Sequence, residues 1–194
     1  MGQRVAEVQR KTKETDIKLI LNIDGNGDYK ISTGIGFFDH MLQLFSHHGK
    51  FDIQLEAKGD IYIDDHHTIE DVGIVLGQAF LKALSDKRGI KRYAHVILPM
   101  DEALVMVAVD ISGRPYLAFD VDFKLPKLGD MTSQMVVEFF KAFVWSSKTT
   151  VHIKKLSGEN DHHVCEAIFK AVGRTLKEAC TIIDDRIPSS KGVL

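Results

Sequence analysis

The sequence predicts an α+β fold in which two related halves, each with the element order ββαβα, form mixed sheets covered on one face by two helices. Two observations indicate the duplication. The motif D-H-H-x-x-E at residues 65–70 recurs 96 residues later at residues 161–166. After each copy, apolar residues follow at i, i+3, i+4 and i+7, which is typical of an amphipathic helix facing a core. The two halves are therefore expected to end in equivalent helices.

The earlier parts of the halves also match. Residues 13–25 align with residues 101–113 at an offset of 88, with Glu on Glu, apolar on apolar and Gly on Gly. Both segments alternate or are rich in β-branched residues and end at a turn residue, so each predicts a strand that enters a hairpin. In the first half a helix at 36–45 and a strand at 51–56 should follow, and in the second half a helix at 134–143 and a strand at 150–155.

The motif helices come last in each half, and Asp65 and Asp161 are expected to be their N-caps. The two halves, 1–88 and 89–194, should form one compact domain, because neither alone would bury much core.

Composition excludes several classes of partner. Hydrophobic residues make up 44% and charged residues 27% of the 194-residue chain, and 25 basic against 27 acidic residues leave a net charge of −2. Such a balance gives no general attraction to nucleic acid or to an anionic membrane, so neither partner is expected. The chain begins without an apolar signal-like stretch. Cys165 and Cys180 are predicted to be reduced core residues, and together these features predict a cytoplasmic location.

The repeated histidine pairs predict metal binding. Imidazole and carboxylate groups are ligands that divalent transition metals prefer. A single His-His pair would more simply be a solvated helix cap, but repetition with the same Glu favours a pair of metal half-sites. Adjacent helical side chains point about 100° apart, so one pair does not chelate one ion from one side. His66 and Glu70 would therefore serve one metal while His67 reaches a second.

The second copy would do the converse, with His162 and Glu166 on one metal and His163 on the other. The first predicted helix of each half adds one candidate ligand, namely His40 and Glu138. Each metal then has about four protein ligands and keeps positions for substrate or water, as catalytic metals require.

Three cations are candidates for binding an anionic group. Arg114 follows Gly113 in a predicted turn, Lys191 lies in the tail Pro-Ser-Ser-Lys-Gly at 188–192, and Arg92 is the third. Hydroxyls, backbone donors and an ammonium group are suited to a phosphate, although solvated cations and a frayed tail are the simpler alternative. The segment 24–28 resembles part of a calcium loop but lacks its acidic twelfth position, so a hairpin turn is expected.

Several motifs together resemble the imidazoleglycerol-phosphate dehydratase family of histidine biosynthesis, and the resemblance covers nearly the whole chain. They are F-D-H-M at 38–41, D-D-H-H-T-I-E-D at 64–71, P-M-D-E-A at 99–103, D-I-S-G-R-P at 110–115, E-N-D-H-H at 159–163 and the Ser-Lys-Gly tail. One position departs from the pattern, because Glu138 stands where many members have a further His.

The resemblance implies loss of water from imidazole glycerol phosphate to give imidazole acetol phosphate, with two Mn²⁺ per subunit. The two metals would grip both ring nitrogens and hold the ring as an imidazolate. By resemblance, proton transfer falls to Glu14, with Asp101 and Lys170 as helpers. The phosphate would be held by Gln43, Arg92, Arg114, Ser189 and Lys191. The family also implies a 24-subunit assembly with sites between subunits.

Two other functions share part of this residue set. A metal-dependent hydrolase would use the same ligands but needs no phosphate grip. A non-catalytic metal-binding protein would need closed coordination and would have no use for Glu14 or Arg114. Turnover of a phosphorylated imidazole substrate separates all three.

Overall fold

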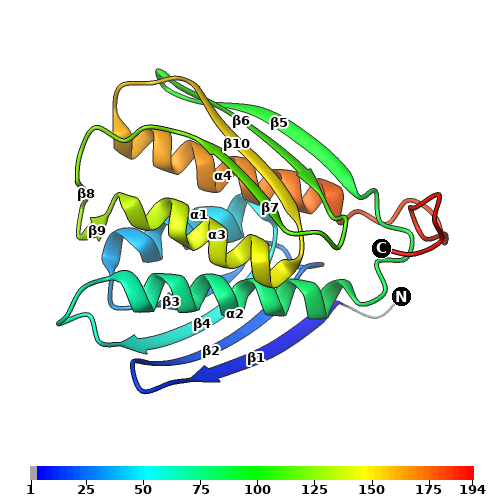
Figure 1. Cartoon of the computed structure of the whole chain (residues 1–194), viewed down its shortest axis with the longest axis horizontal. Coiled ribbons are helices and arrows are strands. Elements are labelled where there is room, and N and C mark those ends of the chain that lie inside the picture. The colour runs from blue at the N-terminus through cyan, green and yellow to red at the C-terminus, as the bar shows by residue number, and fades with distance from the viewer. Residues whose placement is uncertain (1–3) are drawn as a thin grey trace.

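The computed structural model describes residues 4–194. In this part of the chain, two four-stranded sheets enclose four helices (Figure 1). The first half contains β1 (Val5–Lys11), β2 (Thr15–Asn22), β3 (Tyr29–Ser32), α1 (Gly36–Gly49), β4 (Asp52–Gly59) and α2 (His66–Leu84). The second half contains β5 (Tyr93–Met100), β6 (Ala103–Asp110), β7 (Tyr116–Asp120), β8 (Lys127–Leu128), β9 (Met131–Thr132), α3 (Gln134–Ser147), β10 (Thr150–Ser157) and α4 (Asp161–Ala179).

The two sheets have the same topology. The strand orders are β1-β2-β4-β3 and β5-β6-β10-β7, and in each sheet three strands are antiparallel while the last one pairs in parallel. The duplicated α+β fold with mixed sheets is thus confirmed. Each sheet has one strand more than the predicted order ββαβα provides, because three strands and not two precede the first helix of each half.

The predicted hairpins after β2 and β6 are wrong. β2 does not pair with β3, because β4 lies between them, and the segment 24–28 instead crosses the end of β4. Asp52 at the start of β4 accepts hydrogen bonds from the backbone N–H groups of Asn26, Gly27 and Asp28 at 2.8, 3.1 and 3.1 Å. These bonds draw the segment across the sheet. The hairpins lie at the other ends of these strands, between β1 and β2 and between β5 and β6.

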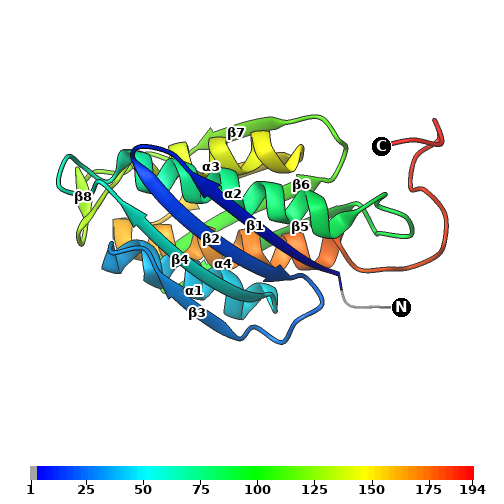
Figure 2. The ribbon, with the colours of Figure 1, turned by 90° about the horizontal axis from the view of Figure 1, so that it is seen from below.

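Each motif helix packs against the first helix of the opposite half, so α2 lies on α3 and α4 lies on α1 (Figures 1 and 2). Glycines allow the close approach. A Cβ on Gly77 would lie 2.5 Å from the carbonyl oxygen of Phe143, and one on the equivalent Gly173 would lie 2.5 Å from that of Phe45. The core is rich in phenylalanine, with Phe38, Phe139 and Phe169 among the fully buried side chains.

The expected N-cap of α4 is wrong. Asn160 caps this helix, accepting from the backbone N–H groups of His162 and His163, while Asp161 lies inside it. The Asp161 carboxylate instead accepts the N–H groups of Lys124 and Leu125, each at 2.7 Å. Its side chain therefore binds the long connection between β7 and α3 and does not cap the helix.

Asp65 occupies the N-cap position of α2 but makes no capping bond with its side chain. Its carboxylate accepts the N–H of Thr132 in the same connection. Asp130 in turn accepts the N–H groups of Gly36 and Phe37 at the start of α1. The connection between β7 and α3 thus ties together the beginnings of α1, α2 and α4.

Two further expectations concern the cysteines and the membrane. Cys165 and Cys180 are free and fully buried, as predicted, and burial raises the pKa of the Cys180 thiol to about 12. Among residues 4–194, we find no helix with the length and apolar character that a membrane span requires.

Candidate metal centre

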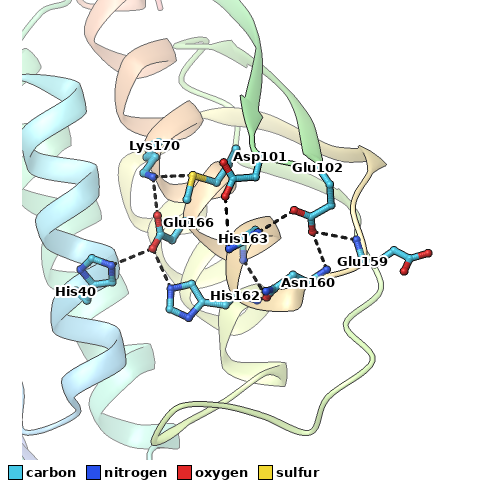
Figure 3. A network of polar contacts seen from close by, with 10 residues as sticks. His40, Asp101, Glu102, Glu159, Asn160, His162, His163, Glu166 and Lys170 are labelled. Carbon is cyan, nitrogen blue, oxygen red and sulfur yellow. Dashed lines mark hydrogen bonds and ion pairs between the residues drawn. The ribbon is translucent and has the colours of Figure 1, made fainter.

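Three of the predicted ligands meet where α4 packs on α1. His40 Nε2 lies 3.1 Å and His162 Nε2 lies 2.9 Å from the same oxygen of Glu166 (Figure 3). The donor atoms of the three side chains all lie within 4.8 Å of one another, and within residues 4–194 this is the one such group of three or more. His40 comes from the first half and the other two from the second half. A single metal site therefore needs both halves.

The Glu166 carboxylate is held in its ionised form. Burial raises its pKa, but hydrogen bonds from Lys170, His40 and His162 outweigh this effect and bring the pKa down to about 2. Lys170 donates to the second oxygen at 2.5 Å, and Glu166 is only 8% exposed. A buried anion beside two imidazoles is a donor set that a divalent cation would fit.

The residues of the equivalent group in the repeat lie farther apart. His66 Nε2 lies 4.0 Å from Glu70 on α2, which matches the pairing of His162 with Glu166. Glu138 on α3 forms an ion pair with Lys141 at 2.7 Å. Glu70, Glu138 and Lys141 all line one open hollow of about 860 Å³ between α2, α3 and β7. The structure thus brings His66, Glu70 and Glu138 to one region without forming a cluster.

His67 and His163 face away from both groups. The His67 ring uses Nδ1 to contact Asp60 at 3.0 Å. The His163 ring uses Nδ1 to contact Glu102 at 2.8 Å (Figure 3). The predicted divergence of adjacent histidines is confirmed, because the ring centroids within each pair are 6.1 and 6.2 Å apart at steep angles. Hydrogen bonds to the carboxylates raise the pKa of both His67 and His163.

Asp60 and Glu102 did not emerge from the sequence as site residues. Nothing in the spacing of Asp60 marks it, because it lies in the loop between β4 and α2. Glu102 carried one signal, since it is the repeat counterpart of Glu14. Its hydrogen bond with His163, together with backbone N–H groups, lowers the pKa of Glu102 to about 2.

The predicted catalytic residues lie around these histidines. Glu14 is in the turn between β1 and β2, and its negative charge contributes to the raised pKa of His67. Asp101 lies 3.8 Å from His163 Nε2 in the turn between β5 and β6. Lys170 donates to Glu166 and contacts the Met100 sulfur at 3.3 Å (Figure 3).

The predicted phosphate-binding cations form a second group. Arg92 donates to Asp110 at 2.8 Å and to the carbonyl oxygen of Pro188 at 2.7 Å. Arg114 lies 3.9 Å from the same Asp110 carboxylate. Arg92 and Arg114 thus meet at Asp110, and the Pro188 contact attaches the tail that carries Ser189 and Lys191 to Arg92. Gln43, one turn after His40 on α1, lies outside this group.

The two groups do not meet within one chain. The backbone N–H of Arg92 binds the carbonyl oxygen of Ala179, the last residue of α4, whereas His162 lies at the beginning of that helix. At the helical rise, 17 residues separate the two ends by about 25 Å. One small substrate cannot span both groups of the same chain.

Known proteins match this chain along its length. The family model described as imidazoleglycerol-phosphate dehydratase matches residues 33–176. The dehydratase of Caldicellulosiruptor bescii is 98% identical over 100% of both chains, and that of Clostridioides difficile is 56% identical over 98% of this chain and 100% of the other.

A crystal structure of imidazoleglycerol-phosphate dehydratase from Staphylococcus aureus superimposes with a TM-score of 0.84 at 42% identity, covering 92% of this chain and 99% of the other. The chain belongs to the imidazoleglycerol-phosphate dehydratase family.

Proposed function

We propose that the chain dehydrates imidazole glycerol phosphate to imidazole acetol phosphate at a di-metal centre shared between subunits. The dehydratase activity in histidine biosynthesis follows from the family and its near-identical full-length relatives. The observation that carries the metal part of the proposal is the convergence of His40, His162 and Glu166. Three protein ligands leave coordination positions for a substrate, whereas a structural site would be closed.

The repeat supports a second metal. His66, Glu70 and Glu138 occupy on α2 and α3 the places that His162, Glu166 and His40 occupy on α4 and α1. We assign two Mn²⁺ per subunit from the resemblance to the family; the carboxylate ligands suit manganese, although the imidazole ligands also suit other divalent metals. When bound, the metals would polarise the imidazole ring of the substrate and fix its orientation.

His67 and His163 would complete the metal sites of neighbouring subunits. Both rings point away from the ligand group of their own chain, and the phosphate-binding arginines lie about 25 Å along α4 from His162. A complete site then requires more than one chain. Such an arrangement requires self-association, and the resemblance to the family points to a 24-subunit assembly working in the cytoplasm.

The protein side chains would divide the remaining work. Glu14 would accept or return the proton at the carbon chain of the substrate, since it lies outside both ligand groups. Asp101 would assist beside His163. Lys170 would keep the Glu166 carboxylate ionised and in place, because it is already engaged there. Arg92, Arg114, Ser189 and Lys191 would bind the phosphate, and Gln43 would contact the substrate from α1.

The proposal is tested by turnover. The purified protein should convert imidazole glycerol phosphate to imidazole acetol phosphate, lose this activity on chelation and regain it with Mn²⁺. A matched variant, Glu178→Gln, changes an exposed residue of α4 that pairs with Lys91 and should leave turnover unchanged. Full turnover after complete demetallation would refute the di-metal centre, and no turnover with Mn²⁺ restored would refute the substrate.

A further inference from the structure

The second histidine of each motif has one ring nitrogen committed to a carboxylate. Asp60 contacts Nδ1 of His67 through both oxygens, at 3.0 and 3.3 Å, and Glu102 contacts Nδ1 of His163 at 2.8 Å. An ionised carboxylate can only accept a hydrogen bond. In the neutral ring Nδ1 therefore carries the hydrogen, and the lone pair is on Nε2. Such a partner fixes both the tautomer and the ring orientation of a metal-binding histidine.

Both carboxylates are themselves fixed. Asp60 is 9% exposed and lies directly after β4. Glu102 uses its other oxygen to accept the backbone N–H groups of Asn160 at 2.9 Å and Glu159 at 3.4 Å (Figure 3). Glu102 therefore joins the turn between β5 and β6 to the residues that begin α4 and to the ring carried by that helix.

The two carboxylates come from different places in the repeat. Glu102 is the counterpart of Glu14, at an offset of 88, whereas Asp60 has no acidic counterpart among residues 156–158, which are Leu, Ser and Gly. If the halves were strictly equivalent, Glu14 would hold His67. In the structure Asp60 does so instead.

We propose that Asp60 and Glu102 are positioning residues that hold His67 and His163 with Nε2 free for a metal, and that Asp60 thereby releases Glu14 for proton transfer. The two equivalent acids of the repeat then have different roles. Glu102 orients a metal ligand, and Glu14 transfers a proton in the reaction. The proposal rests on the proposed function only in taking His67 and His163 as metal ligands.

Two measurements on metal-free protein test it directly. With ¹⁵N-labelled histidine at a pH where the rings are neutral, NMR should show His67 and His163 as the Nδ1–H tautomer. Asp60→Asn should move His67 toward a mixture of tautomers and leave His163 unchanged, while Glu102→Gln should do the reverse. An amide can donate as well as accept, so it no longer imposes one tautomer. Finding Nε2–H rings in the unmodified protein would overturn the proposal without any variant.

Metal affinity gives the second readout. Titration of Mn²⁺ against a competing chelator should show affinity lower by about 10–100-fold in Asp60→Asn and Glu102→Gln, as is typical when such partners are lost. Glu178→Gln, which changes an exposed residue of α4 that pairs with Lys91, is the control and should bind Mn²⁺ like the unmodified protein. Equal affinities in all four proteins, with circular dichroism showing intact folds, would contradict the proposal. Because neither readout uses substrate, a failure of the proposed reaction would appear separately.

Discussion

Glu166 is the residue on which the proposed metal centre depends most. Its two oxygens contact two imidazoles from opposite halves of the chain and the ammonium group of Lys170. The lysine offsets the cost of burying the carboxylate and keeps it charged. A charged, nearly buried ligand is therefore available before any metal arrives, which reduces the rearrangement that metal binding requires.

Glu14→Gln should separate chemistry from metal binding. The amide keeps the shape of the side chain but cannot accept the substrate proton, and general acid–base groups commonly contribute about 10²–10⁴-fold to the rate. Turnover should fall within that range while Mn²⁺ content, measured by elemental analysis, stays intact. A variant that retained more than about half of the unmodified turnover would exclude Glu14 as the base and favour Asp101.

The pH dependence of Mn²⁺ binding should reflect the raised pKa values of His67 and His163. A metal binds the neutral ring, so affinity should fall as the pH falls through these values, beginning above the ordinary histidine pKa of 6.5. In the metal-free protein the sign is opposite. A histidine with a raised pKa adds stability that is present below pH 6.5 and lost as the pH rises through the folded value.

Calorimetric titration of Mn²⁺ across pH, beside urea unfolding of the metal-free protein, measures both trends. In Glu102→Gln the midpoint of the metal-binding curve should move to lower pH, because the carboxylate that raises the His163 pKa is gone. An unchanged midpoint would mean that His163 is not among the ligands that titrate.

The sequence was sufficient to name candidate ligands but insufficient to place all of them. Histidine pairs with a Glu at helical spacing reveal ligand chemistry locally, so His162 and Glu166 could be paired in advance. His40 lies 126 residues from Glu166, and only the packing of α1 on α4 brings them together. The contacts of Asp60 and Glu102 with His67 and His163 could not be predicted, although Glu102 is the repeat counterpart of Glu14, because they depend on how loops fold back onto the helices.

At the scale of elements, two glycine contacts set the distance between the helices that carry the ligands. Gly173 allows α4 to approach α1, and Gly77 allows α2 to approach α3. These are equivalent positions of the repeat, and each faces a backbone carbonyl oxygen on the first helix of the other half. The distances between candidate ligands at the beginnings of the helices therefore depend on Gly77 and Gly173, which lie further along α2 and α4.

Gly77→Ala and Gly173→Ala should each destabilise the fold by about 1–3 kcal/mol, because an added methyl group would overlap a backbone carbonyl oxygen that cannot easily move. Gly173→Ala should also weaken Mn²⁺ binding, since it separates His40 from His162. Urea unfolding and metal titration measure the two effects. Gln78→Ala, an exposed neighbour on α2, is the control and should change neither. Two fully stable glycine variants would show that the helices are less tightly constrained.

The helices and the central strands could be predicted because their periodic patterns are long. β3 has only four residues, which are exposed or partly exposed, and it pairs in parallel with β4 rather than with the strand before it. A short edge strand of this kind has no alternating buried face to reveal it. The hairpin expected at 24–28 does not form because backbone N–H groups of this segment donate hydrogen bonds to Asp52. Those contacts arise only when β4 is placed in the sheet, so the local sequence does not reveal them.

At the scale of the whole molecule, the candidate ligand group and Arg92, the first of the proposed phosphate-binding residues, lie at opposite ends of α4. The residue types in the sequence indicated both groups, but the distance between the groups is known only once the structure shows where each lies along α4. The proposed dehydration requires ring and phosphate of one small molecule to be held together. The fold of one chain therefore favours an enzyme whose sites are completed by neighbouring chains.

Removing the metal should loosen the assembly as well as stop turnover. Binding free energy that holds ligands from two chains also holds the chains together. The chelated protein should therefore have a smaller mass by light scattering after size exclusion, and added Mn²⁺ should restore the original mass. A mass unchanged by complete demetallation would indicate that the sites lie within one chain or that other contacts maintain the assembly.

The most direct test of a shared site mixes two inactive proteins. His162→Ala removes a metal ligand, and Arg114→Ala removes an exposed phosphate-binding side chain, so each variant alone should be nearly inactive. After demetallation, mixing and addition of Mn²⁺, hybrid assemblies should contain some sites with both residues intact, and turnover should rise well above the sum of the two separate variants. If mass spectrometry showed that the subunits had exchanged but turnover remained at that sum, the claim that each site is completed by a neighbouring chain would be wrong.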